Sequence, residues 1–339
     1  MRRHGIVTLA AVLLSACTIQ RWQQVESSGM DDHMSHMSAV DLGAPVIFPA
    51  SGSSQGSPGL PPSANTAEAR LKASPRHAEW VKVAWEPGSK DSIMAWIVYP
   101  ASRTKAPVVV VVHEIFGLST WVRGVADQVA AEGFIAIAPD FLSRVRGGPS
   151  SDELPSQQAT GLIRNVSNTD KNTVIVAAAN YAMTQPSAEK RYGVIGYCWG
   201  GTATFNHAIH GGVMGFSGGV AFYGLPYTSA GSPATATTPA VGGVPIADSL
   251  AKIKMPVMLL SGSKDARITA AFPALDSMMK ALGKNYSSKN YEGAVHGFLR
   301  AQDDPKAQRD EAEEAANLFA TKDGWLKTVA FLKKNLGVK

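Results

Sequence analysis

The stretch of this 339-residue chain with the clearest chemical potential is a cysteine set between glycines. Residues 192–201 read YGVIGYCWGG, so Cys198 stands between Gly196 and Gly200 after a short apolar run. This spacing is typical of a nucleophile elbow, where a strand turns so sharply into a helix that only glycines fit beside the nucleophile. An elbow also aims the next backbone N–H, that of Trp199, at a carbonyl oxygen under attack. The alternative is a buried small apolar residue beside a packing glycine.

Two side chains further along the chain could serve that thiol as acid and base. Asp265 ends the sequence GSKD, and His296 lies in the loop sequence GAVHGF. A thiol is mostly protonated at neutral pH, so it needs a base, and an imidazole base needs a carboxylate on its far nitrogen. The alternatives are an aspartate that hydrogen-bonds its own turn and a histidine that is satisfied in the core.

The elements that must position these groups alternate between apolar strands and helical stretches. Residues 107–112 read PVVVVV, the pattern of a strand buried on both faces. We expect further strands at 79–85 and 93–99 (an antiparallel edge pair), 133–140, 192–197, 216–223, 256–262 and 287–291. We expect helices at 119–131, 172–183, directly after the elbow, at 270–282, and from 306 to 336 with an interruption near 323–324. Residues 141–170 and 225–247 are expected as loops, the second a candidate lid.

This alternation predicts an α/β fold with a mostly parallel sheet flanked by helices, in one domain over residues 74–339. In such sheets functional groups gather beyond the carboxyl ends of the strands. Glu114, Cys198, Asp265 and His296 all follow expected strands, and we therefore expect them to lie together.

The N-terminus resembles the export signal of bacterial lipoproteins. A short basic start precedes an apolar run over 5–14, too short to span a bilayer as a mature helix, and the run ends in LSAC at Cys17. The resemblance implies that residues 1–16 are removed and that Cys17 is lipidated, which would attach an exported chain to a membrane, in the periplasm at the outer membrane if the source is Gram-negative. The alternative is an ordinary signal peptide.

Residues 17–73 are rich in Ser, Gly and Pro and predict a flexible tether. Within it, residues 31–37 read DDHMSHM, which could bind copper, although a polar linker is the simpler interpretation. A disulfide between Cys17 and Cys198 is rejected because lipidation explains the first cysteine better.

The formal charge of +5 is spread without a basic patch interleaved with aromatic residues, which argues against nucleic-acid binding. His207 and His210 lack a third ligand, and His113-Glu114 does not open an HExxH motif, so we expect no metal and no cofactor. We expect a monomer.

Together four motifs carry a family resemblance: EIFG at 114–117, GYCWGG at 196–201, GSKD ending at Asp265, and HGFLR at 296–300. From about residue 107 to its C-terminus the chain resembles the dienelactone hydrolase family (carboxymethylenebutenolidases) of the α/β-hydrolase superfamily. That resemblance implies hydrolysis of a small ester or lactone by a triad of Cys198, His296 and Asp265 through a thioester.

It further implies that Glu114 pairs at rest with Arg300, that a substrate carboxylate competes for this arginine, and that the freed glutamate takes the thiol proton. The oxyanion hole would consist of the backbone N–H groups of Ile115 and Trp199. Tyr223, at the end of its strand, matches a family tyrosine near the site.

The sequence also departs from the family. His113 stands where the enol-lactone enzymes carry glutamine, and a second substrate-binding arginine has no motif; Arg144, Arg146 and Arg164 lie in the right stretch. Two other functions therefore stay open: a broader esterase or thioesterase of the cell envelope, and a catalytically silent surface lipoprotein that binds its ligand.

Overall fold

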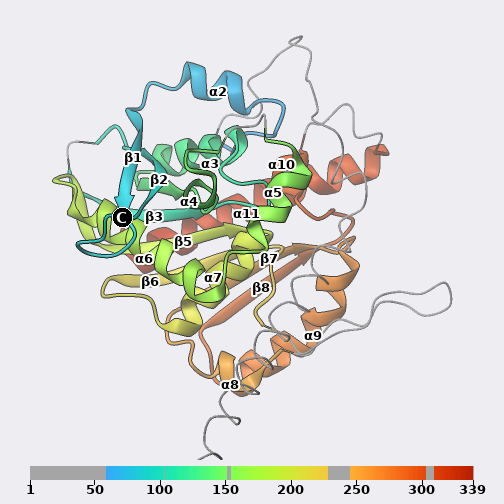
Figure 1. The fold of residues 1–339 in the computed structure, drawn as a ribbon. Helices are drawn as coiled ribbons and strands as arrows, with labels where there is room; N and C mark the ends of the chain where they lie inside the picture. Colours follow the sequence, from blue (N-terminus) through green and yellow to red (C-terminus); the bar gives the residue numbers. More distant parts are fainter. Residues whose placement is uncertain (1–58, 103, 151–153, 228–244, 303–308, 339) are drawn as a thin grey trace, which may run out of the picture.

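In the computed structural model, residues 59–102, 104–150, 154–227, 245–302 and 309–338 are described, and they build an eight-stranded sheet between helices (Figure 1). The strand order is β1-β2-β4-β3-β5-β6-β7-β8; β2 pairs antiparallel with β1 and β4, and the other neighbours run parallel. The strands are β1 (Ala78–Ala84), β2 (Ser92–Val98), β3 (Ala106–Val112), β4 (Ile135–Pro139), β5 (Ala188–Tyr197), β6 (Phe216–Phe222), β7 (Val257–Gly262) and β8 (Tyr286–Tyr291). The expected α/β fold with a mostly parallel sheet is confirmed.

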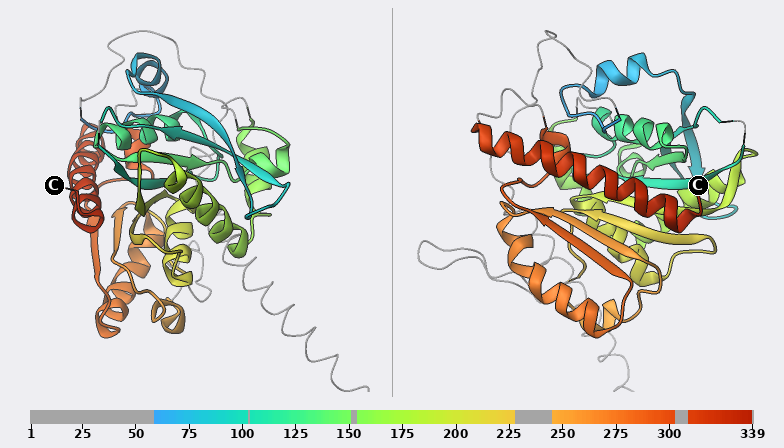
Figure 2. Two further views of the ribbon diagram at one scale, coloured as in Figure 1. Left: turned by 90° about the vertical axis from the view of Figure 1, so that its left-hand side faces the viewer. Right: turned by 180° about the vertical axis from the view of Figure 1, so that it is seen from behind.

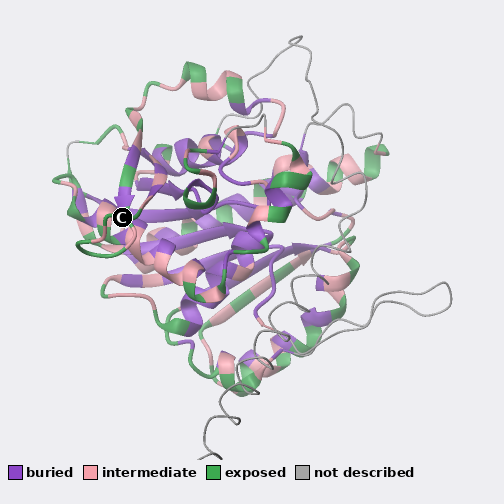
Figure 3. Ribbon diagram, viewed as in Figure 1, coloured by how far each residue is buried: buried purple, intermediate pink, exposed green. Residues whose placement is uncertain are grey.

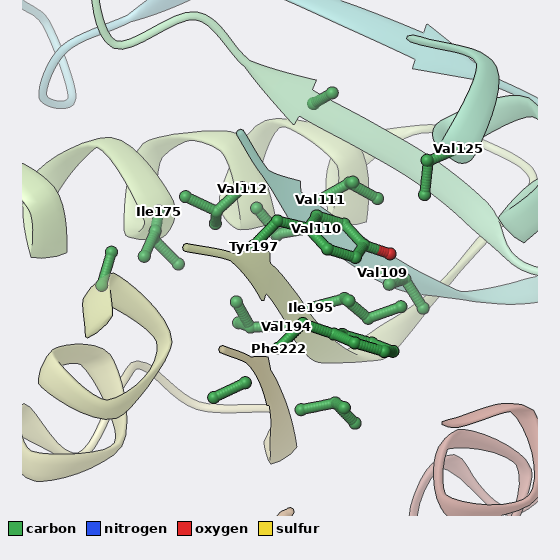
Figure 4. Packing of buried hydrophobic residues seen from close by; sticks show 14 of the residues in the cluster. Val109, Val110, Val111, Val112, Val125, Ile175, Val194, Ile195, Tyr197 and Phe222 are labelled. Carbon is green, nitrogen blue, oxygen red and sulfur yellow. The ribbon is translucent and has the colours of Figure 1, made fainter. Parts of the chain in front are cut away.

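The centre of the sheet is the most deeply buried part of the molecule (Figure 3). Every residue of β3 is buried, as the run of valines predicts for a strand covered on both faces. In Figure 4 the β3 side chains Val109 to Val112 lie beside Val194 and Ile195 of β5. This packing fixes the carboxyl ends of β3 and β5, the two ends that lead to Glu114 and Cys198.

Helices cover both faces of the sheet. The long α11 crosses the back of the sheet in the right-hand view of Figure 2, while α6 and α7 lie together on the opposite face. The helices are α2 (Ala67–Ala73), α3 (Thr120–Ala131), α4 (Ser143–Arg146), α5 (Ser156–Ile163), α6 (Asn168–Thr184), α7 (Trp199–His210), α8 (Ala247–Leu250), α9 (Ala266–Ala281), α10 (Phe298–Ala301) and α11 (Glu311–Leu336). Among the described residues no helix is both long and apolar enough to cross a membrane.

Three expectations for the loops and the last helix are wrong. Residues 141–170 hold α4, α5 and the start of α6, whose N-terminus is set by a capping box between Ser167 and Asp170. The last helix begins at Glu311, after an Asp310 N-cap, and continues through Gly324, because that glycine is buried against Leu260 and Phe222 where the helix approaches the sheet closely. The short α10 was not expected. The candidate lid lies mostly outside the described residues, and its last residue, Ala247, begins α8.

The expected tether ends too late. Residues 59–73 are not a linker: Leu60, Ser63, Thr66 and Ala67 are buried, and α2 lies against α3 (Figure 1). The proline- and serine-rich composition misled the prediction because residues 59–66 pack individually against the domain and the helix that follows them, α2, is short. The rest of the expected tether, with residues 1–16, Cys17 and the motif at 31–37, lies outside the described residues.

Candidate active site

Cys198 lies on a strained turn between β5 and α7. Its φ of 56° and ψ of −115° are rare for a residue with a side chain. The flanking glycines are required: a Cβ on Gly196 would come within 1.9 Å of the Gly200 oxygen, and one on Gly200 within 2.4 Å of the Val112 oxygen. The structure therefore has the strand, sharp turn and helix that the motif predicts, and the thiol sits at the apex with only 1% of the residue exposed.

Asp265 and His296 meet at the carboxyl end of the sheet. Asp265 caps α9 through a bond from the Ile268 N–H to its Oδ1 (3.2 Å), while its Oδ2 lies 2.5 Å from His296 Nδ1. The alternative reading of this aspartate, as a group that bonds its own turn, is therefore also true. Because the cap fixes the carboxylate, the ring of His296 is held with one nitrogen on Asp265.

His296 also interacts electrostatically with Cys198, which brings thiol, imidazole and carboxylate together in one set. Burial lowers the pKa of His296, but the Cys198 sulfur, the Asp265 carboxylate and the hydrogen bond to Asp265 raise it well above its ordinary value. Burial raises the pKa of Asp265, yet His296 outweighs that effect and, together with Arg267 and the Ile268 N–H, brings it to about 2. The ring can thus hold a proton while the aspartate stays ionised.

Glu114, in the turn after β3, is paired with Arg300 of α10. Arg300 Nε lies 3.0 Å from Glu114 Oε2, and the carboxylate side chain is only 4% exposed. The guanidinium also lies over the ring of Phe116, 5.6 Å from its centroid. The glutamate is therefore held by a cation that is itself more open, with 27% of its side chain exposed.

Tyr223 stands among these groups at the end of β6. Its ring centroid is 4.9 Å from that of His296, and its backbone φ of 39° is unusual for tyrosine. Burial, followed by the charge of Glu114, raises the pKa of its hydroxyl well above the ordinary value. The hydroxyl is buried and makes no hydrogen bond within the described residues, so it is available to a ligand.

His113 precedes Glu114 and is completely buried. The Phe141 N–H donates to its Nε2 (3.1 Å), so the other ring nitrogen, Nδ1, carries the proton and donates to the Glu114 carbonyl (2.6 Å). Its ring stacks on Trp199, with centroids 5.9 Å apart and planes 12° apart. Burial lowers the pKa of His113 despite the nearby Asp140 charge. This neutral histidine thus touches both segments expected to supply oxyanion donors.

Two of the three arginines in the expected substrate stretch, Arg144 and Arg146, are engaged elsewhere. Arg144 pairs with Asp91 and lies over the Trp85 ring, and Arg146 donates to the Pro149 carbonyl. Arg144 lines a surface pocket of about 290 Å³ beside β2, which none of the candidate catalytic residues lines. His207 bonds Tyr192 and Asn172 within the fold, and the described residues hold no group of three potential metal ligands.

Residues 93–336 match the dienelactone hydrolase family. The chain belongs to this family. It is 29% identical over 246 residues to an inferred carboxymethylenebutenolidase of Synechocystis sp., covering 69% of this chain and 94% of the relative. It is also 34% identical over 113 residues to the carboxymethylenebutenolidase of Pseudomonas sp. strain P51, covering 32% of this chain and 48% of that protein. The expected class, a hydrolase acting on ester or lactone bonds, is confirmed at that level.

The fold agrees with solved structures of the same family. The crystal structure of an inferred dienelactone hydrolase from Klebsiella pneumoniae has a TM-score of 0.54 with 22% sequence identity, covering 75% of this chain and 98% of that chain. At this identity the likeness concerns the fold. It confirms the expected α/β-hydrolase architecture.

The structure brings together the predicted Cys198, His296 and Asp265, and it pairs Glu114 with Arg300 beside Tyr223. Ile115 lies three residues after the end of β3, and Trp199 lies two residues after the end of β5. In the sequence, His113 is recognisable only as a departure from the family pattern. Its position next to Glu114 and after a buried strand was the available signal, but the bond from Phe141 joins residues 28 apart and has no sequence pattern.

Proposed function

We propose that this protein hydrolyses a small ester or lactone by covalent catalysis at Cys198. The observation that carries the proposal is the juxtaposition of three groups: Cys198 at the apex of a glycine-framed elbow, His296 in electrostatic contact with it, and Asp265 hydrogen-bonded to His296. A connected nucleophile, base and orienting carboxylate is the arrangement that acyl transfer needs.

In the first half of the reaction the Cys198 sulfur loses its proton to a base and forms a bond to the substrate carbonyl carbon. The tetrahedral intermediate then breaks its carbon–oxygen bond, and the base gives the proton taken from Cys198 to the leaving alcohol oxygen. In the second half His296 takes a proton from water, the hydroxide attacks the thioester, and the carbon–sulfur bond breaks. His296 then gives its proton to the departing sulfur, so the products are a carboxylic acid and the regenerated thiol. For a lactone, acid and alcohol belong to one molecule.

The Glu114–Arg300 pair gates the first step for substrates that carry a carboxylate. Such a substrate competes for Arg300, and the released Glu114 accepts the Cys198 proton. The pair is suited to this because the glutamate is buried while the arginine is partly open. Tyr223, whose buried hydroxyl has no bond within the described residues, offers a hydrogen bond to the substrate.

The developing oxyanion is stabilised by the backbone N–H groups of Ile115 and Trp199. In a trans peptide the C=O and the following N–H point in opposite directions. His113 holds the Glu114 carbonyl, so the Ile115 N–H of the same peptide plane is turned away from that histidine. His113 also stacks on Trp199, so one side chain contacts both donor segments.

The test is turnover of p-nitrophenyl acetate by the full chain beside Cys198→Ala, with mass spectrometry of the acylated protein. We expect acetylation of Cys198 and turnover that vanishes in the variant. A comparison of enol-lactones with acyl-thioesters then separates a lactone hydrolase from a broader esterase or thioesterase. An unreactive Cys198 and no turnover of any ester would instead leave a binding protein.

We also propose that the chain is exported and held at a membrane through lipidated Cys17. The support is the LSAC sequence after a short apolar run. Labelling with palmitate in cells, with and without the lipoprotein signal peptidase inhibitor globomycin, tests this. A mature chain that is fully soluble and unlabelled would contradict it.

A further inference from the structure

Residues 60–66, here called the strap, precede α2 in the chain and lie against α10, the helix that carries Arg300. The backbone N–H of Ala64 donates to the Arg300 carbonyl at 3.0 Å, and the side chain of Gln302 donates to the Pro61 carbonyl at 3.0 Å. The strap precedes the part of the chain that matches the family, which begins at residue 93.

The strap is built into the domain rather than resting on it. Trp121 of α3 donates from its indole to the Pro62 carbonyl at 2.8 Å, and Arg70 donates to the Leu60 carbonyl at 2.6 Å. Gly124 of α3 makes the room, because a Cβ there would come within 2.7 Å of the Pro62 ring. The Trp121 and Gly124 contacts fix the strap against α3, and the Arg70 bond ties it to α2.

The helix that receives the strap is too short to satisfy its own backbone carbonyls. α10 is four residues long, so its last carbonyls have no partner within the helix. The Gln302 side chain donates a hydrogen bond to the Leu299 carbonyl at 2.9 Å, and Ala64 of the strap donates one to the Arg300 carbonyl. The preceding Gly297 has a φ of 73°, a conformation open to glycine because it has no Cβ. This residue therefore does little to restrain the start of α10.

We propose that the strap is a positioning element for Arg300 and thereby sets the preference of the site for substrates that carry a carboxylate. It connects α3 to the backbone of Arg300, whose guanidinium pairs with Glu114 on its other side. Displacement of the strap leaves the thiol, imidazole and aspartate untouched but shifts the arginine. This inference rests on the proposed role of Arg300 in binding the substrate carboxylate.

The experiment compares two esters of similar length, p-nitrophenyl hemisuccinate, which is anionic, and p-nitrophenyl butyrate, which is neutral. The wild-type full chain is compared with two variants. Gly124→Ala pushes the strap away from α3 and raises the helix propensity of α3 itself. Gln302→Met removes the bonds from Gln302 to the strap and to Leu299. We expect the ratio of kcat/KM for the anionic over the neutral ester to fall about threefold to tenfold, the size of one ordinary hydrogen bond, with the neutral ester little changed.

Ser74→Ala is the matched control, because it removes a bond from the end of α2 to Asp127 (2.6 Å) without touching the strap. It should keep the wild-type ratio. A wild-type ratio in Gly124→Ala and Gln302→Met, with a collapsed ratio in Arg300→Met, would overturn the role of the strap and leave the proposed function intact. An unchanged ratio in Arg300→Met would overturn the carboxylate site itself and this inference with it.

Discussion

The Glu114 carboxylate lies 3.0 Å from the Nε of Arg300, and the two residues are far apart in sequence, one in the turn after β3 and the other in α10. The pair joins a buried acid to a cation that a ligand can reach. Charge-assisted bonds of this kind are worth about 1.5–3 kcal/mol. A competing carboxylate on the substrate can therefore exchange for Glu114 with little net cost.

Replacement of Arg300 by methionine should affect charged and neutral substrates differently. Loss of the charge-assisted bond should raise KM for a carboxylate-bearing ester roughly tenfold to a hundredfold, since the arginine no longer binds it. The measurement is steady-state kinetics on the hemisuccinate and butyrate esters. The control is Arg191→Met, because Arg191 forms an ion pair with Glu189 near the start of β5. Equal losses on both esters would contradict a carboxylate-binding role.

Replacement of Asp265 by asparagine should separate catalysis from stability. Asn can still accept the Ile268 N–H as an N-cap, so the part of the free energy of unfolding that comes from the cap should be kept. It cannot hold the imidazolium of His296, and kcat should fall by about a thousandfold or more. Urea unfolding and single-turnover acylation measure the two effects. Asp265→Ala should lose about 1 kcal/mol in addition, because the cap is lost.

His113 should be replaceable by glutamine but not by leucine. A Gln side chain can donate to the Glu114 carbonyl and accept from the Phe141 N–H, as the neutral histidine does. Leucine can do neither, so the Ile115 peptide is freed and acylation of Cys198 should slow by up to about a hundredfold.

Alkylation of Cys198 by iodoacetamide serves as the control for His113, since that reaction develops no oxyanion. Its rate should be the same in His113→Leu and the wild type. If alkylation and acylation slow in parallel, the histidine affects the thiol or the fold as a whole rather than the oxyanion donors.

The sequence allowed the sheet and the triad to be predicted because both depend on local patterns. A run of five valines predicts a strand buried on both faces, and β3 has that character. Gly196 and Gly200 mark the elbow because each would clash with backbone if it carried a Cβ. Asp265 and His296 lie in the loops that follow β7 and β8, so the fold itself brings them to one edge.

The parts that could not be predicted depend on contacts between distant residues. The strap has no periodicity, and its partners Trp121 and Gln302 lie about 60 and 240 residues away in sequence. The polar composition of residues 141–170 hid three helical segments, because α4 and α5 are short and are stabilised by tertiary contacts such as the bond from Met94 N–H to the Ser143 hydroxyl (2.9 Å).

Buried neutral histidines should make the fold sensitive to acid. His207 is fully buried between Tyr192 and Asn172, and burial, assisted by His210, lowers its pKa to about 3. In the unfolded chain a histidine titrates near 6.5. Because the folded pKa is the lower one, the stabilisation is fully present above about pH 6.5 and is lost as the pH falls toward 3. At pH 5 this one group should cost roughly 2 kcal/mol.

His207→Gln isolates that contribution, because Gln can donate to Asn172 and accept from the Tyr192 hydroxyl without titrating. Urea midpoints at pH 7.5 and pH 5 measure the effect in the wild type and the variant. The wild type should lose more stability between the two values than the variant does. His113, whose pKa is also lowered by burial, accounts for part of the loss that remains in the variant. Identical pH dependence in both proteins would mean that His207 does not titrate on unfolding.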